Sequence, residues 1–205
     1  MKRFELILLL LVLVLVLPSW ADLLKIGKID TYDAGFKSVY PIVVRCNLND
    51  KSEHIYLDAN EGGYVYQLKL KGRNIAQLRK LIDKVLEWHD TAVTHNVQTN
   101  VRKTVEVLVY SEIWWRVGAR GDAYHSPTFY MEGTFVYVNP EASGVILVMA
   151  NPSSTDNPYI RPDMKDRFIS VEELYKLKEI LNPEFIEKKL DEFIKKQDAI
   201  DDLFQ

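Results

Sequence analysis

The period of the hydrophobic residues changes along this chain, and the change limits the fold more than any other feature of the sequence. Between residues 75 and 94 the apolar residues recur every three or four positions, which indicates one long amphipathic helix. On both sides of it apolar and polar residues alternate, a period of two that indicates β-strands. The alternating segments are residues 37–48, 54–59, 64–70, 101–117 and 128–138. Residues 145–150 are apolar on both faces and indicate a sixth, central strand.

These elements predict an α+β fold. A mostly antiparallel sheet of about six strands is covered by one central helix and a C-terminal helix pair, in the order βββ-α-βββ-αα. Asn74 and Gln77 have the spacing of a capping box for the central helix, as do Ser170 and Glu173 for the next one. Residues 151–168 hold three prolines and many short polar side chains, so we expect a surface loop there. A β-sandwich with peripheral helices is the alternative.

The N-terminus has the three parts of a secretory signal peptide. Lys2 and Arg3 form a basic start, residues 6–17 are all Leu, Ile or Val, and small residues precede a cleavage point after Ala21. The apolar run is shorter than the roughly 20 residues that cross a bilayer, although an uncleaved anchor is an alternative. The predicted units are a signal peptide over residues 1–21 and a single α+β domain over residues 22–205, with its C-terminal helices in residues 170–205.

Export and composition limit the partners. The chain carries 26 Lys and Arg against 29 Asp and Glu, a formal net charge of −3, so it lacks the excess of positive charge that binds phosphate backbones. We expect a periplasmic or secreted protein with no nucleic-acid partner and, after signal cleavage, no membrane span. The chain has one cysteine and no Asn-x-Ser/Thr sequon, a composition that fits a bacterial exported protein.

Cys46 is the only cysteine, so no disulfide can form within one chain. It shares a strand face with Ile42 and Val44, and this pattern predicts a buried, slow-reacting thiol. An intermolecular disulfide is the alternative.

No group of residues has the spacing of a metal site. His89 and His95 are six positions apart, which places their rings on different sides of a helix. The segment that begins at Asp58 resembles the start of a calcium loop, but Gly62 and Lys69 occupy positions that need oxygen ligands. We therefore expect a hairpin turn here, and no metal or other cofactor in the protein.

Two motifs lie between residues 120 and 126. Asp122, His125 and Ser126 are the residue types of a hydrolase triad, but side chains this close in sequence seldom converge, and a polar loop is the expected interpretation. Arg120, Gly121 and Asp122 form an Arg-Gly-Asp tripeptide, so integrin adhesion through an exposed loop is an alternative.

The segment 101–117 carries aromatic residues that are candidates for a binding surface. Tyr110, Trp114 and Arg116 share one face of this strand, opposite the face of Trp115. We expect a helix to cover the Tyr110 face, because the helical stretches need sheet surface to pack on. If solvent reaches this face instead, the three residues form a flat platform for a sugar or a peptide. Tyr110, Trp114 and Arg116 are the candidate binding residues.

The sequence contains no catalytic constellation, so the predicted function is an exported, non-catalytic binding protein with an unidentified protein, peptide or glycan partner. An exported hydrolase is one alternative; it requires the segment from Asp122 to Ser126 to meet a carboxylate or histidine from elsewhere. An envelope structural or assembly component is another, in which the amphipathic residues 185–204 hold a partner.

Overall fold

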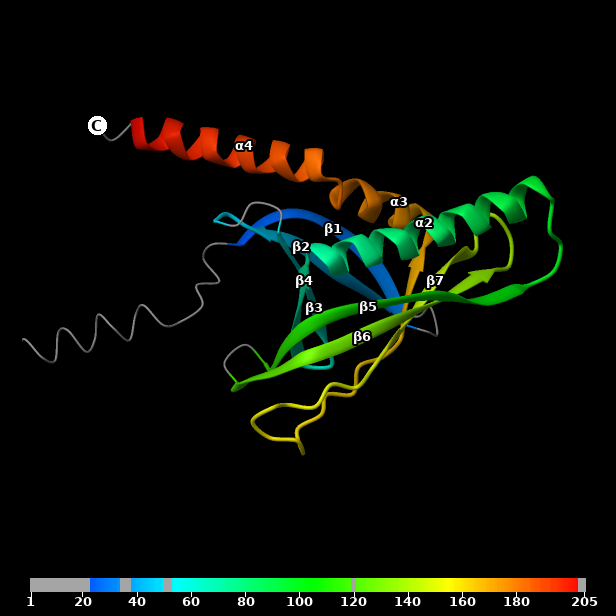
Figure 1. Cartoon of the computed structure of the whole chain (residues 1–205), viewed down its shortest axis with the longest axis horizontal. Coiled ribbons are helices and arrows are strands. Elements are labelled where there is room, and N and C mark those ends of the chain that lie inside the picture. Colours follow the sequence, from blue (N-terminus) through cyan, green and yellow to red (C-terminus); the bar gives the residue numbers. More distant parts are fainter. Residues whose placement is uncertain (1–22, 34–37, 50–52, 119–120, 203–205) are drawn as a thin grey trace, which may run out of the picture.

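The computed structural model describes residues 23–33, 38–49, 53–118 and 121–202, and within them it contains eight strands and three helices (Figure 1). The strands are β1 (Leu23–Asp33), β2 (Val39–Asn47), β3 (His54–Glu61), β4 (Tyr64–Lys71), β5 (Val101–Val117), β6 (Ala123–Tyr137), β7 (Ser143–Met149) and β8 (Arg167–Ser170). The helices are α2 (Gly72–Thr94), α3 (Val171–Ile180) and α4 (Pro183–Asp201).

The eight strands form a closed antiparallel barrel in chain order. Each strand pairs with the next, and β8 pairs with β1 through Phe168 opposite Tyr32 and Arg167 opposite Asp33. The predicted α+β class and antiparallel pairing are confirmed, but the predicted open sheet of about six strands is wrong. Along the chain, β1 to β4 are followed by α2, and β5 to β8 are followed by α3 and α4.

The two strands that the sequence did not predict are the ones that close the barrel. A register shift between Lys25 and Gly27 breaks the alternation of β1. Strand β8 has only four residues and directly follows the proline-containing segment, so its pattern is too short to recognise.

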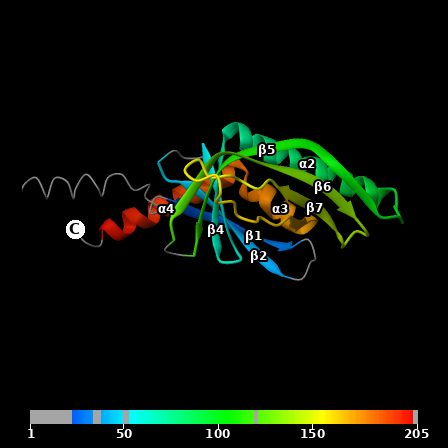
Figure 2. The same cartoon turned by 90° about the horizontal axis from the view of Figure 1, so that it is seen from below.

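Helices α2, α3 and α4 all lie on one side of the strands (Figures 1 and 2). Glycine lets two of them approach the sheet closely: a Cβ at Gly133 would lie 3.0 Å from a Leu81 side-chain carbon of α2, and a Cβ at Gly27 would lie 2.5 Å from one of Ile180 of α3. The buried face of α2 and the inward side chains of the strands form one hydrophobic core. Cys46 is buried in this core, as predicted.

The helix starts differ in how well the sequence predicted them. Strand β4 runs directly into α2, whose N-cap is Lys71 without a side-chain hydrogen bond, so the predicted capping box from Asn74 is wrong. Ser170 does cap α3, since its hydroxyl accepts a hydrogen bond from the Glu173 backbone N–H at 3.3 Å. Asn182 caps α4 by accepting from the Glu184 N–H at 3.0 Å.

Helix α4 packs on the molecule only in its first half. Ile186 and Leu190 are buried, whereas Ile194 and Ile200 are exposed on the half that extends beyond the barrel (Figure 1). Among the described helices, none is long and apolar enough to cross a membrane. The predicted signal peptide lies outside the described residues and stays a prediction.

Candidate functional site

The two neighbouring tryptophans of β5 point to opposite sides of the barrel wall. Trp115 belongs to the core, with Val109 and Ile113 on the same face. Tyr110 and Trp114 lie on the outer face, where Tyr110 is 42% exposed. Because α2 packs against the inner face of β5, the expectation that a helix covers the Tyr110 face is wrong.

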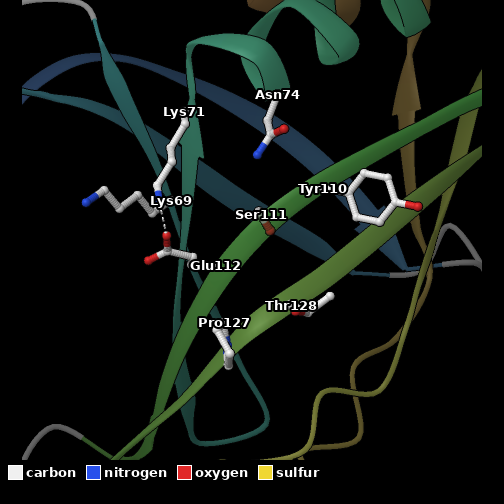
Figure 3. A pocket seen from close by; sticks show the side chains of 8 residues that line it. All are labelled: Lys69, Lys71, Asn74, Tyr110, Ser111, Glu112, Pro127 and Thr128. Atoms are coloured by element: carbon white, nitrogen blue, oxygen red, sulfur yellow. Dashed lines mark ion pairs between the residues drawn. The ribbon is translucent and has the colours of Figure 1, made fainter.

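A hollow of about 250 Å³ lies at the point where β4 separates from β5 (Figure 3). The last cross-strand pair between the two strands joins Lys69 and Glu112, and after Lys71 the chain turns into α2. The hollow therefore collects side chains from β4, α2, β5 and β6. Its lining residues are Lys69, Lys71, Asn74, Tyr110, Ser111, Glu112, Pro127 and Thr128.

The charges in the hollow are two ammonium groups and one carboxylate. Lys71 forms an ion pair with Glu112, drawn as a dashed line in Figure 3. The ammonium of Lys69 lies 5.9 Å from the centroid of the Tyr56 ring, at the distance of a cation–π interaction. Figure 3 shows the Lys69 side chain directed away from Tyr110 and Ser111, so the hollow itself offers a ligand the Lys71–Glu112 pair and the backbone of β5 beside the Tyr110 ring.

Two aromatic pairs extend this surface along β5 and β6. Tyr110 and Tyr130 are cross-strand neighbours with ring centroids 6.3 Å apart, and Trp114 stacks on His125 at 4.5 Å with an interplanar angle of 25°. These four residues are called the aromatic strip below. Arg116 follows two residues after Trp114, at the end of the strip, and so the structure places all three predicted binding residues on one outer face.

One edge of β5 has no strand beside it in the described part of the chain. Strand β6 pairs with β5 from Val101 to Arg116, but β4 pairs only with residues 112–117. Over residues 101–111, the side of β5 that faces away from β6 has no neighbouring strand among the described ones, and we call it the β5 edge. A second cavity, of about 430 Å³, lies between this edge and α2. It is lined by Lys80, Asp83, Lys84, Glu87 and Trp88 of α2 and by residues 103–107 of β5.

Trp88 forms the aromatic wall of this second cavity. The ammonium groups of Lys84 and Lys103 lie 5.5 and 4.3 Å from its ring centroid. Sequence analysis missed Trp88 and the lysines of β4. The sequence does not show that these residues lie near β5, because they come together only where β4 separates from β5 in the folded chain.

The calcium-like segment is a hairpin turn, as expected. Gly62 and Gly63 have φ of 55° and 84°, the left-handed region that a two-residue hairpin of this kind requires. Asp58 accepts hydrogen bonds from Arg45 Nε at 2.6 Å and from Gln67 Nε2 at 2.9 Å. Its carboxylate is therefore committed to neighbouring side chains.

The triad residue types do not converge. His125 stacks on the outer Trp114, whereas Ser126 is buried and its hydroxyl donates to the Thr128 carbonyl at 3.1 Å. Asp122 is exposed. Arg120 of the Arg-Gly-Asp tripeptide lies outside the described residues.

The histidines near the end of α2 have local partners. His89 Nδ1 lies 2.8 Å from Ser143 Oγ, and His95 is the C-cap residue of α2. In the described residues, no three His, Cys, Asp or Glu side chains are close enough to hold a metal ion.

Comparison of the chain with protein-family models, with curated proteins and with solved structures finds no match. The interpretation of the surface therefore rests on its geometry.

Proposed function

We propose that this protein is an exported, non-catalytic binding protein, and that it binds an extended peptide segment of a partner along the β5 edge. Export is supported by the signal-like residues 1–21. The observation that carries the proposal is the coincidence of an unpaired strand edge with two cavities and a row of outward aromatic side chains.

The backbone of the β5 edge specifies the shape of the ligand. A strand edge presents N–H and C=O groups that another extended chain can pair with. In this mode main-chain hydrogen bonds supply affinity, and alternate side chains of the peptide enter pockets on the two faces. Here the hollow beside Tyr110 would receive the peptide side chains that point to the outer face. The cavity beside Trp88 would receive the peptide side chains that point toward α2.

The side chains around the edge favour a peptide with both apolar and acidic residues. Tyr110 and Trp88 provide aromatic surface at the two cavities, and such residues are enriched at binding hot spots. Lys103 holds its ammonium group 4.3 Å from the centroid of the Trp88 ring, in the cavity beside the β5 edge, where a peptide carboxylate can reach it.

Selection from a displayed library of random peptides on the immobilised protein tests the proposal. Wild-type protein should enrich sequences with alternating apolar and acidic residues. Tyr110→Ala should weaken the selected peptides by about tenfold or more, as expected for an aromatic hot spot that lines the hollow at the β5 edge.

Tyr175→Ala is the matched control. Tyr175 is 48% exposed, close to the value for Tyr110, but it lies on α3. This variant should bind the selected peptides as wild type does. No enrichment, or equal losses in Tyr110→Ala and Tyr175→Ala, would refute the proposal. Binding of glycans but not peptides, lost in Trp114→Ala, would replace the peptide with a sugar at the same face.

An envelope assembly role is a second candidate, favoured by the protruding half of α4. Ile194 and Ile200 are exposed there, as expected of a helix that packs against a partner. In this case the purified protein should self-associate in analytical ultracentrifugation. Changing both isoleucines to Glu should make it monomeric, whereas Lys195→Glu should not. A wild-type monomer would exclude self-assembly through α4.

A further inference from the structure

The outer face of β5, β6 and β7 carries a patch of exposed apolar side chains. Leu108 of β5 lies opposite Glu132 of β6, which in turn lies opposite Val148 of β7. Tyr110 and Tyr130 form the next cross-strand pair on the same face. The four apolar side chains are between 37% and 42% exposed, and we call them, with Glu132 among them, the outer patch. Apolar side chains that gather on one exposed face mark an interaction site.

A second apolar surface is exposed on the half of α4 that extends beyond the barrel (Figure 1). Phe193, Ile194 and Ile200 continue the apolar stripe that begins with the buried Ile186 and Leu190. Ile194 is 51% exposed and Ile200 is 46% exposed. An amphipathic helix is stabilised when such a stripe packs against another apolar surface.

These two surfaces cannot meet within one molecule. Helix α4 packs against α3 and β1, and all three helices lie on one side of the strands (Figures 1 and 2). The outer patch faces away from the helices, because α2 packs against the inner face of β5. A contact between the stripe of α4 and the outer patch therefore requires two copies of the protein.

The stripe and the patch are complementary in size and in charge. Residues 191–201 of α4 rise about 16 Å along the helix axis, and three neighbouring strands span about 10 Å, so this half of the helix can lie across the patch. Lys196 is three residues from Phe193 and four from Ile200, which places it at the border of the stripe. Neither Lys196 nor Glu132 forms an ion pair with another described residue.

We propose that the protruding half of α4 packs on the outer patch of a second copy of this chain, with Lys196 beside Glu132. This inference rests on the assembly role given above as the second candidate function, and it names the surface that receives α4. Helix and patch are different surfaces, so the contact is head-to-tail and each pair of copies keeps one free helix and one free patch. Such contacts build filaments, or rings where the rotation closes.

Analytical ultracentrifugation of wild type and two variants tests the proposal. Wild type should form a series of species that grows with concentration. A helix variant with Ile194→Glu and Ile200→Glu, and a patch variant with Val148→Lys, should each be monomeric at concentrations where wild type associates. Both should keep the circular dichroism spectrum of wild type, because the substituted side chains are exposed.

Mixing the two variants gives the decisive result. The helix variant keeps its patch and the patch variant keeps its helix, so an equal mixture should form a 1:1 dimer and nothing larger. Val39→Lys is the control, because Val39 is an exposed valine on β2, and it should associate as wild type does. A mixture that stays monomeric, or a patch variant that associates as wild type does, would refute the proposal.

Charge reversal tests the position of the helix on the patch. Glu132→Lys and Lys196→Glu should each weaken association by about fivefold, and their combination in one chain should restore it. If the helix variant is monomeric but Val148→Lys and Glu132→Lys associate as wild type does, α4 pairs with another surface. The assembly role then stands and this inference is wrong. A wild-type monomer at all concentrations would refute both.

Discussion

At the scale of the residue, Trp114 and Trp115 show how alternation along a strand assigns different roles to identical neighbours. Trp115 is nearly inaccessible in the core, whereas Trp114 is half-buried against His125 on the outer face. The sequence predicted the alternation itself and the three residues of the outer face. It could not predict that this face is uncovered, because the helices could pack on either side of an unassembled sheet.

Alanine substitution should separate the two tryptophans. Trp115→Ala opens a large cavity in the core and should reduce the free energy of unfolding by about 3–5 kcal/mol. Trp114→Ala removes surface stacking and should cost no more than about 1.5 kcal/mol. Urea unfolding monitored by circular dichroism measures both. Equal destabilisation would show that Trp114 belongs to the core and would remove the argument for a surface role.

Tyr66 should make stability fall at alkaline pH. Its pKa in the folded state is raised above the ordinary 10.0, so below about pH 9 both states keep the proton and stability does not depend on it. Above pH 10 the Tyr66 hydroxyl ionises in the unfolded state but not in the folded state. The free energy of unfolding should therefore fall by about 1.4 kcal/mol per pH unit. Between pH 8 and about pH 11, the free energy of unfolding of Tyr66→Phe should therefore fall less than that of the wild type. Identical pH profiles would contradict the burial of this hydroxyl.

At the scale of the element, the sequence pattern predicted the interiors of strands and helices better than the residues where they begin and the strand pairs that they form. The cap at Ser170 was predicted because its partner is three residues away. The start of α2 was not, since it is set by the end of β4 and not by Asn74. The β5 edge could not be predicted either, because the register of β4 on β5 depends on the assembled barrel.

The β7–β8 closure should be sensitive to a single methyl group. A Cβ on Gly144 would lie 2.1 Å from the Ile169 carbonyl oxygen, a backbone atom that cannot move alone. Gly144→Ala should therefore destabilise the protein by about 2 kcal/mol or more. Gly72→Ala is the control, because no atom lies within 4 Å of its added Cβ, and it should be neutral or stabilising by up to about 1 kcal/mol. Similar unfolding curves for the two variants would show that the barrel does not close as described.

At the scale of the whole molecule, the barrel uses its two faces for different purposes. The inner face packs against the helices and holds the Glu61–Arg167 pair, and the outer face of β5 and β6 carries the aromatic strip. The peptide-binding function that we propose requires a stable wall and one uncovered surface.

Export predicts a defined mature mass. Protein recovered from the periplasm or the medium should begin at Asp22, because cleavage is expected after Ala21. Intact-mass spectrometry measures this directly. A secreted species that retains residues 6–17 would instead indicate a membrane anchor.

An extended peptide that pairs with the β5 edge would protect the backbone amides of that edge, and amide hydrogen exchange measures this protection. The exchange of the residue 101–111 amides is measured by NMR in the free protein and with a library-selected peptide. Alternate amides along this edge, which point away from β6, should gain protection when the peptide binds, while amides of β2 and β3 should not change. Peptide binding that leaves the β5 edge amides unprotected, or that protects a different strand, would contradict the proposed function.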